Sequence, residues 1–274
     1  MTYHFEAVGL GDKRQTQSPV LRLKDVFGRW EKEFATKGWQ AIYLGSHDQP
    51  RIVSRFGDDA PATRAASAKL LNTFLLSMHG TPYCYYGDEL GMTNIYFKSM
   101  ADYRDVAARN GYQLVKEQHG NEAAYLDFLA HFSRDNSRTP FQWSDARQAG
   151  FTTGTPWLKV NSNYPTLNEA AEDKDPTSVL NHFRRATAMR KAHPVLVYGD
   201  YQLLDKDNPT VWAYTRSQGA ERALVVLNFS SQPQQWPVPA GLRPGQPWLN
   251  NYPTLAGGPT LALEPWQAVV LPLQ

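Results

Sequence analysis

The feature that most constrains the fold is an alternation of short apolar runs with helix-patterned segments in the first 194 residues. The apolar runs predict strands at Met1–Glu6, Ala41–Leu44 and Pro82–Tyr86. Helical periodicity follows the first two runs, near Leu23–Thr36 and near Thr63–Met78. Such alternation is typical of βα units in a parallel sheet. A closed (β/α)8 barrel takes about 250 residues and a doubly wound sheet about five strands or more, so three strands predict an incomplete α/β fold.

A long insertion is expected after the third strand. It contains helical stretches near Ala101–His119 and Glu122–His131, followed by Arg134–Tyr164, which shows little periodicity. A last helix is expected near Thr177–Lys191, because Pro194 stops it.

The composition changes near residue 194. Of the 54 charged residues (28 + 26), only 9 lie in the last 80 positions, whereas ten of the 19 prolines lie there. Short β-branched and aromatic runs fall between these prolines, at Tyr201–Leu204, Val211–Thr215, Ala223–Phe229 and Gln267–Leu271. This pattern predicts an antiparallel β-sandwich over residues 195–274, folding more independently than the α/β part over residues 1–194.

Charge, hydropathy and cysteine content exclude several classes of function. The net charge is 28 − 26 = +2 with no run of five or more like charges, which argues against nucleic acid as a partner. No apolar run approaches the ~20 residues that span a bilayer, so no membrane partner is expected. Cys84 is the only cysteine, which leaves no internal disulfide and no cysteine-rich zinc site. Met1–Glu6 lacks the pattern of an export signal, which favours the cytoplasm unless the true amino terminus lies upstream.

The densest polar cluster, Gly45–Arg51, directly follows the strand predicted at Ala41–Leu44. In parallel α/β folds the carboxyl ends of strands carry the active site. Its His47–Asp48 pair is therefore a candidate for catalysis, although a histidine oriented by a loop carboxylate without any catalytic task fits the same residues. Both interpretations stay open on spacing alone.

Tyr86–Gly91 forms a second cluster after the third strand and contains Asp88 and Glu89. Either carboxylate could join Asp48 in the paired arrangement of a glycosidase. A glycine-bounded turn in which Asp88 and Glu89 cap the following helix is the favoured interpretation.

The third cluster, Arg134–Trp143, lies in the irregular stretch. Planar guanidinium donors can grip adjacent sugar hydroxyls while an aromatic ring packs on the sugar face. An ion-pair knot that holds a long loop fits equally well, so these residues predict a site only in combination with others.

At these clusters the sequence resembles the α-amylase family of glycoside hydrolases, specifically its α-glucosidase and oligo-1,6-glucosidase branch. The resemblance covers essentially the whole chain. It is carried by SHDQPRIVSRFGDD (Ser46–Asp59), GTPYCYYGDELGMTN (Gly80–Asn94), RDNSRTPFQW (Arg134–Trp143) and AGFTTGTPWLKVNSNY (Ala149–Tyr164). Ser46, Phe141 and Ser162 depart from residues common in that family, so linkage preference is not predicted.

The resemblance implies roles for five residues. His47 would hydrogen-bond the sugar, and Asp48 would stabilise the oxocarbenium-like transition state without being the nucleophile. Arg138 and Arg134 match arginines of a loop that closes over the non-reducing glucose, and Arg51 is assigned to substrate binding.

The resemblance also implies that part of the catalytic apparatus lies elsewhere. Met1–Glu6 looks like the sixth barrel strand, whereas the family's aspartate nucleophile follows the fourth strand and its glutamate acid follows the fifth. We therefore expect a partial (β/α)8 barrel, about strands six to eight with their helices, followed by the sandwich. Retaining cleavage needs both carboxylates about 5 Å apart, so the isolated chain is expected to be inactive.

The expected whole is a retaining α-glucosidase that acts on short α-linked gluco-oligosaccharides without an organic cofactor or metal. The expected partners are the oligosaccharide and either the amino-terminal barrel half or a second copy of the chain. Two alternatives remain. One is a non-catalytic truncated or split chain that binds sugar or an amino-terminal partner, and the other is a self-assembled fragment that uses Asp48 with Glu89.

Overall fold

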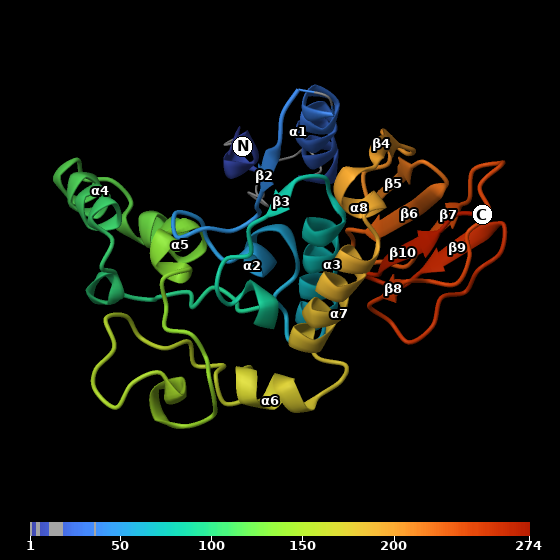
Figure 1. The fold of residues 1–274 in the computed structure, drawn as a ribbon. Coiled ribbons are helices and arrows are strands. Elements are labelled where there is room, and N and C mark those ends of the chain that lie inside the picture. Colours follow the sequence, from blue (N-terminus) through green and yellow to red (C-terminus); the bar gives the residue numbers. More distant parts are fainter. Residues whose placement is uncertain (1, 4–5, 11–18, 36) are drawn as a thin grey trace.

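The computed structural model describes residues 2–3, 6–10, 19–35 and 37–274. A helix-rich amino-terminal part surrounds a small parallel sheet, and antiparallel strands form the carboxyl-terminal part (Figure 1). The α-helices are α1 (Pro19–Phe34), α2 (Ile52–Phe56), α3 (Arg64–Ser77), α4 (Val106–Glu117), α5 (Glu122–Phe132), α6 (Glu169–Lys174), α7 (Val179–Ala192) and α8 (Val195–Tyr198). The strands are β1 (Thr2–Tyr3), β2 (Gln40–Ile42), β3 (Thr81–Pro82), β4 (Asp200–Leu203), β5 (Val211–Gln218), β6 (Glu221–Asn228), β7 (Gln234–Pro237), β8 (Leu249–Asn250), β9 (Thr260–Leu263) and β10 (Ala268–Pro272).

The parallel sheet has the order β1-β2-β3 and is open, as expected for a partial barrel. Thr2 pairs with Gln40, and Ala41 pairs with Thr81. The second and third strands are shorter than predicted. Of the first predicted strand, Thr2–Tyr3 are strand and Glu6 begins a 3-10 turn, while residues 1, 4 and 5 lie outside the described residues.

The third strand, predicted at Pro82–Tyr86, is Thr81–Pro82. The N–H of Tyr83 still donates to the carbonyl of Ile42 (2.7 Å). The chain then leaves the sheet and turns at Gly87, whose φ of 89° is a conformation that suits glycine. The polar segment that follows is thereby bent over the end of β2.

The predicted helices are present, with ends set by capping groups. α7 begins where the Ser178 hydroxyl accepts the N–H of Asn181 (3.1 Å), and it ends before Pro194. α4 begins at Val106 rather than near Ala101, because the Asp105 carboxylate accepts the N–H of Ala107 (3.0 Å) and caps the helix there. No helix among the described residues is long and apolar enough to cross a membrane.

The carboxyl-terminal part contains a five-stranded antiparallel sheet, β4-β5-β6-β10-β8, and a two-stranded sheet, β7-β9. Side chains alternate between the two faces of a strand. On β5, Val211 and Ala213 join a core with Trp236 of β7, so the two sheets pack face to face. Trp212 and Tyr214 point to the other face and join the core built around α3.

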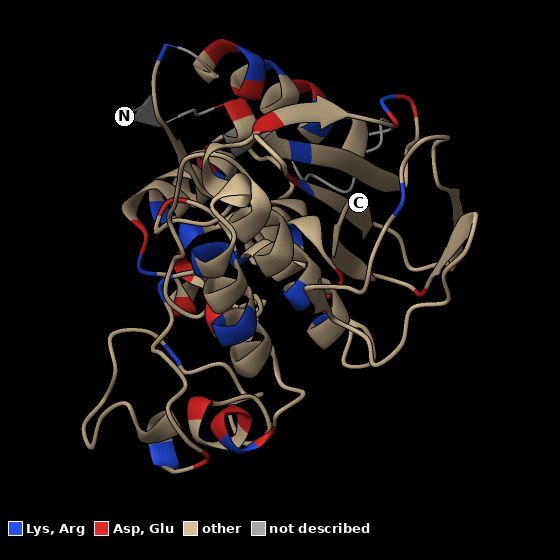
Figure 2. Ribbon diagram, turned by 45° about the vertical axis from the view of Figure 1, so that its right-hand side comes forward, with Lys and Arg blue, Asp and Glu red and all other residues tan. Residues whose placement is uncertain are grey.

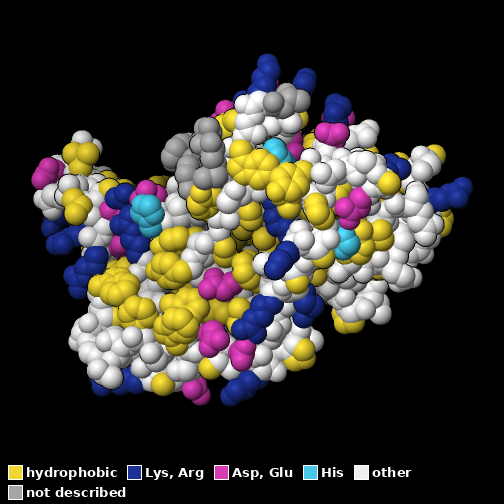
Figure 3. Space-filling view, in the orientation of Figure 1, with side chains coloured by type: hydrophobic (Ala, Val, Ile, Leu, Met, Phe, Trp, Pro, Cys, Tyr) yellow, Lys and Arg dark blue, Asp and Glu magenta, His cyan; other side chains and the backbone are white. Residues whose placement is uncertain are grey.

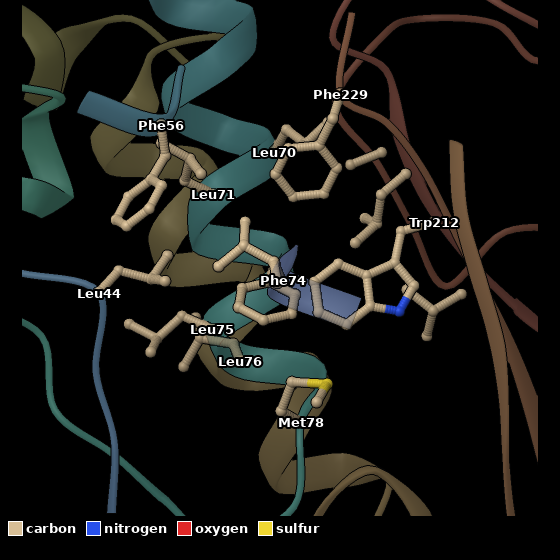
Figure 4. Packing of buried hydrophobic residues seen from close by; sticks show 14 of the residues in the cluster. Leu44, Phe56, Leu70, Leu71, Phe74, Leu75, Leu76, Met78, Trp212 and Phe229 are labelled. Carbon is tan, nitrogen blue, oxygen red and sulfur yellow. The ribbon is translucent and has the colours of Figure 1, made fainter. Parts of the chain in front are cut away.

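The larger sheet is therefore buried on both faces, and the amino- and carboxyl-terminal parts share one hydrophobic core. Figure 4 shows Trp212 and Phe229 packed against Phe74 of α3, and the rings of Phe74 and Trp212 are 4.7 Å apart. One face of this sheet thus packs against α3 and the other against β7 and β9, and the expectation that residues 195–274 fold more independently than residues 1–194 stays a prediction. Charged residues are sparse on this sheet and frequent on the helices, as the composition indicates (Figure 2).

Buried ionic side chains make two sets of contacts between elements. Glu31 of α1 pairs with Arg216 of β5 (2.7 Å), and both side chains are almost fully buried. Arg190 of α7 donates to the carbonyls of Leu76 (2.9 Å) and Met78 (2.7 Å), which satisfies the carboxyl end of α3.

Candidate active site

Asp48 lies at the centre of a charged cluster beyond the carboxyl end of β2. Its Oδ1 accepts hydrogen bonds from Arg134 (3.2 Å) and Arg138 (3.1 Å). Its Oδ2 lies 3.3 Å from Nε2 of His47. Half of the Asp48 side chain is exposed (49%), as is most of His47 (70%). The structure thus brings four predicted site residues together, with a carboxylate that is both held and accessible.

Arg138 connects the two residues of the predicted pair. Its Nε donates to the backbone carbonyl of His47 (2.8 Å), while its NH2 group reaches Asp48. The carbonyl of Arg138 in turn accepts the indole N–H of Trp157 (2.8 Å). Two segments that are far apart in sequence are therefore fixed against each other at the site.

Arg134 is hydrogen-bonded to Asp105, a residue that was not predicted from the sequence to belong to the site. Arg134 donates to Asp105 through Nε (2.8 Å) and NH2 (2.6 Å), the two-bond geometry in which guanidinium and carboxylate fit best. These hydrogen bonds lower the pKa of Asp105 and raise that of Arg134. Asp105 also caps α4, so the helix end, the arginine and Asp48 form one chain of contacts.

The segment that carries both arginines is folded by its own polar residues. The buried Asp135 carboxylate accepts the N–H groups of Arg104 (2.7 Å) and Asp105 (2.9 Å). Nδ2 of the buried Asn136 donates to the carbonyl of Ala130 (3.0 Å) at the end of α5. The ion-pair knot considered from the sequence therefore exists, and it is centred on Asp48.

Arg51 lies beneath this cluster rather than in it. It is 1% exposed, its N–H donates to Asn94 (3.0 Å), and its guanidinium donates to the carbonyl of Tyr86 while lying 4.9 Å from that ring. These contacts tie the loop after β2 to the loop after β3. Its expected contact with substrate stays a prediction.

Asp88 and Glu89 differ in environment. Oε2 of Glu89 accepts the N–H of Gly87 (2.7 Å), which is the capping type of contact favoured from the sequence, and burial raises the pKa of Glu89. Asp88 is 2% exposed, its Oδ1 has no hydrogen-bond partner among the described residues, and burial raises its pKa to about 7. Asp48 and Glu89 are thus engaged with different groups. Within the described part of the chain no cluster of three His, Cys, Asp or Glu side chains is placed to hold a metal ion.

Comparison with known families divides the chain in two. Residues 1–199 match the model "Alpha amylase, catalytic domain", and residues 201–270 match "Maltogenic Amylase, C-terminal domain". The first match covers more than half of the chain.

The chain is similar to several characterised enzymes. It is 42% identical over 253 residues to the oligo-1,6-glucosidase of Parageobacillus thermoglucosidasius, covering 90% of this chain and 45% of the relative. It is 40% identical to the trehalose-6-phosphate hydrolase of Bacillus subtilis, covering 91% and 45%. The chain spans about half the length of the curated relatives it matches.

Solved structures of related enzymes superpose on nearly the whole of this chain and on about half of their own length. The trehalose-6-phosphate hydrolase of Bacillus licheniformis superposes with a TM-score of 0.93 at 36% identity, over 99% of this chain and 51% of that one. The trehalulose synthase of Pseudomonas mesoacidophila superposes with a TM-score of 0.89 at 41% identity, over 93% and 47%.

Proposed function

Because the chain belongs to the α-amylase family of glycoside hydrolases, we propose that it is the carboxyl-terminal part of a retaining α-glucosidase acting on short α-linked gluco-oligosaccharides. The observation that carries this proposal is the Asp48 cluster. An accessible carboxylate, oriented by two arginines, lies beside a histidine at the carboxyl end of a parallel strand.

Asp48 is suited to stabilise positive charge. Glycoside cleavage passes through an oxocarbenium-like transition state, in which the anomeric carbon becomes positive. Both arginines bind Oδ1 of Asp48, which fixes the plane of the carboxylate before substrate arrives. A charge that is oriented in advance stabilises the transition state without a cost of reorganisation at the moment of reaction.

The neighbouring side chains have separate tasks in this proposal. His47, the most exposed member, donates to a hydroxyl of the glucose bound at Asp48. Arg138 closes over the non-reducing end of the substrate, with Arg134 beside it. Arg51 acts indirectly, because its hydrogen bonds fix the loop after β2 against the loop after β3.

Asp48 alone does not supply retaining cleavage, which requires a nucleophile and an acid/base. The family resemblance assigns both to barrel strands that the matched half of the relatives does not include. We therefore propose that the chain becomes catalytic when an amino-terminal barrel half of this family completes the barrel.

A fusion protein tests the proposal. The half of the Parageobacillus thermoglucosidasius oligo-1,6-glucosidase that this chain does not match is joined to the chain, and hydrolysis of 4-nitrophenyl α-glucoside is measured. The fusion should turn over, and the chain alone should not. Asp48→Asn in the fusion should lower kcat by roughly 10² to 10³ with little change in KM, the scale for one preorganised electrostatic partner.

The control is Asp127→Asn, which removes an exposed carboxylate on α5 (75% exposed) by the same chemical change. It should leave kcat unchanged. Near-normal turnover by the Asp48→Asn fusion would remove Asp48 from catalysis, and turnover by the unfused chain would point to a carboxylate pair within it.

A further inference from the structure

A cavity of about 420 Å³ lies between the amino- and carboxyl-terminal parts of the chain and has no part in the function proposed above. Its walls come from the first residues of α1, the end of α2, the segment after β6 and the turn before β10. None of the residues of the Asp48 cluster lines it. The volume falls in the range of ~300–1,000 Å³ that is usual for small-molecule sites.

One buried donor in this lining lacks an acceptor. The indole N–H of Trp266 has no hydrogen-bond partner in the described part of the chain, and the residue is only 8% exposed. An indole nitrogen can donate but not accept, and an unpaired buried donor costs free energy. A ligand with an acceptor oxygen would supply the missing partner.

Two other buried tryptophans show what is usual in this fold. The indole N–H of Trp212 donates to the hydroxyl of Tyr201 (3.0 Å), and that of Trp236 donates to Asp205 (3.1 Å). Buried tryptophans generally pair their N–H groups in this way. Trp266 departs from this rule at the one position where the ring lines the cavity.

The turn that carries Trp266 is fixed by its backbone. Trp266 has a φ of 57°, a left-handed conformation that bulky residues rarely adopt. Its backbone N–H donates to the carbonyl of Ser230 (3.0 Å), and its carbonyl accepts Nδ2 of Asn251 (2.8 Å). The hydroxyl of Tyr252 donates to the carbonyl of Pro265 (2.9 Å). Backbone strain of this kind clusters at ligand sites, where the surrounding structure maintains it.

Much of the remaining wall is apolar. Val20 and Leu23 of α1, Phe56 of α2 and Phe229 all line the cavity, and none of them is more than 8% exposed. Aliphatic and aromatic side chains of this kind can pack on the apolar face of a sugar ring. They offer no hydrogen bond to water.

The polar groups of the lining favour a neutral ligand. The two charged residues, Arg55 and Asp58, have opposite signs, and Arg55 already donates to the carbonyl of Leu10 (2.8 Å). Oδ1 of Asp58 accepts the N–H of Ala60 (3.1 Å), and a carboxylate has capacity for further donors. Together with the Trp266 N–H, the cavity presents both a donor and an acceptor, which suits hydroxyl groups.

We propose that this cavity is a second, non-catalytic site that binds a neutral monosaccharide. The N–H of Trp266 donates to a sugar oxygen, the carboxylate of Asp58 accepts a hydroxyl, and the apolar wall covers a face of the ring. An ordered water is the competing occupant. It would satisfy Trp266, but a buried water needs two to four polar partners, which the apolar wall does not provide. The proposal goes beyond the glucosidase assignment and does not depend on Asp48.

Calorimetric titration of the full chain tests the site without any turnover. The probes are glucose, sorbitol, which carries hydroxyls without a ring, and cyclohexanol, which carries a ring with one hydroxyl. Glucose should bind roughly tenfold more tightly than either, because it alone offers a ring face together with several hydroxyls. Asp48→Asn should leave this binding unchanged, which separates the site from the candidate active site.

Trp266→Phe keeps an aromatic ring and removes the N–H. It should weaken glucose binding roughly tenfold, whereas the thermal midpoint of the unliganded chain should stay the same or rise, because an unpaired buried donor is removed. Trp236→Phe is the matched control, since it makes the same change at a buried tryptophan outside the cavity whose N–H is bonded. It should lower the thermal midpoint and leave glucose binding unchanged.

Absence of glucose binding, cyclohexanol binding as tight as that of glucose, or glucose binding that Trp266→Phe leaves intact would overturn the proposal. A crystal of the chain soaked in glucose gives a direct view, and an ordered water alone on the Trp266 N–H would also reject the sugar site. A fusion that fails to hydrolyse while glucose still binds in this cavity would reject the glucosidase function and retain the site.

Discussion

At the scale of single residues, Arg138 is the side chain whose chemistry is hardest to replace. It bonds the His47 carbonyl through one nitrogen and Asp48 through another. Lysine has a single nitrogen and cannot make both contacts in this geometry. Arg138→Lys in the fusion enzyme should therefore lower kcat/KM for 4-nitrophenyl α-glucoside by roughly tenfold or more, while the thermal midpoint stays the same.

Arg184→Lys is the control, since Arg184 forms an exposed ion pair with Asp173 away from the cluster. If Arg138→Lys instead lowers the thermal midpoint and leaves the kinetics intact, Arg138 is a structural member of the ion-pair knot only.

Asp88 gives a prediction about pH. Burial raises its pKa to about 7 from an ordinary 3.8, so the folded chain binds a proton that the unfolded chain releases between about pH 4 and 7. Folding stability contributed by this group therefore falls as pH rises through that window. The free energy of unfolding of Asp88→Asn relative to that of the wild type should therefore be higher at pH 8 than at pH 5, by roughly 2 kcal/mol.

Urea unfolding at the two pH values measures the difference. Asp145→Asn is the control, because it makes the same change at an exposed position. A difference that does not change with pH would mean that the Asp88 carboxylate is ionised in the folded chain at both values.

Spacing in the sequence located some site residues and missed others for a physical reason. His47 and Asp48 follow soon after a strand, and active sites of parallel α/β folds lie at the carboxyl ends of the strands. Asp105 sits 29 positions before Arg134 with no pattern linking them, so only folding of the insertion reveals their contact. Asp88 looked like a capping residue, although its neighbour Glu89 takes that role.

At the scale of elements, the buried ion pair between α1 and β5 adds a polar contact to the hydrophobic core that the two parts share. Arg216 is fully buried, and its loss leaves the charge of Glu31 without its partner. Arg216→Ala should lower the free energy of unfolding by about 3–5 kcal/mol. Arg29→Ala, which breaks the exposed pair with Glu6 (3.0 Å), should cost less than about 1 kcal/mol.

Urea unfolding monitored by circular dichroism compares the two variants. Similar losses for both would show that burial does not strengthen the contribution of Glu31 and Arg216.

Elements with strong local signals were predictable, and those fixed by distant contacts were not. Apolar periodicity located α3, and the helical pattern stopped by Pro194 located α7, to within two residues of their ends. The strands β7 and β9 carry weak signals, because Trp236 is the main apolar contribution of β7 to the core. The boundary predicted at residue 194 stays a proposal, and the family models change at residues 199–201, just before the second residue of β4.

At the scale of the whole molecule, the parallel sheet determines how the chain behaves in solution. Its outer strands, β1 and β3, each pair on one side only among the described strands. Unpaired N–H and C=O groups at a sheet edge recruit other chains. Figure 3 also shows a broad area of hydrophobic side chains on the left-hand half of the molecule, which a monomer rarely tolerates.

We therefore expect the chain alone to self-associate at micromolar concentration, and the fusion enzyme to be a monomer because its added strands cover both edges. Size-exclusion chromatography with light scattering gives the two masses. Cys84→Lys should shift the chain toward monomer, since position 84 is exposed just beyond β3 and a lysine at an edge opposes pairing. Gln202→Lys, at an exposed position of the edge strand β4, adds the same charge to the other sheet and should leave the mass unchanged. A monomeric wild-type chain would mean that its edges are already protected, and a dimer that persists in Cys84→Lys would place the contact away from β3.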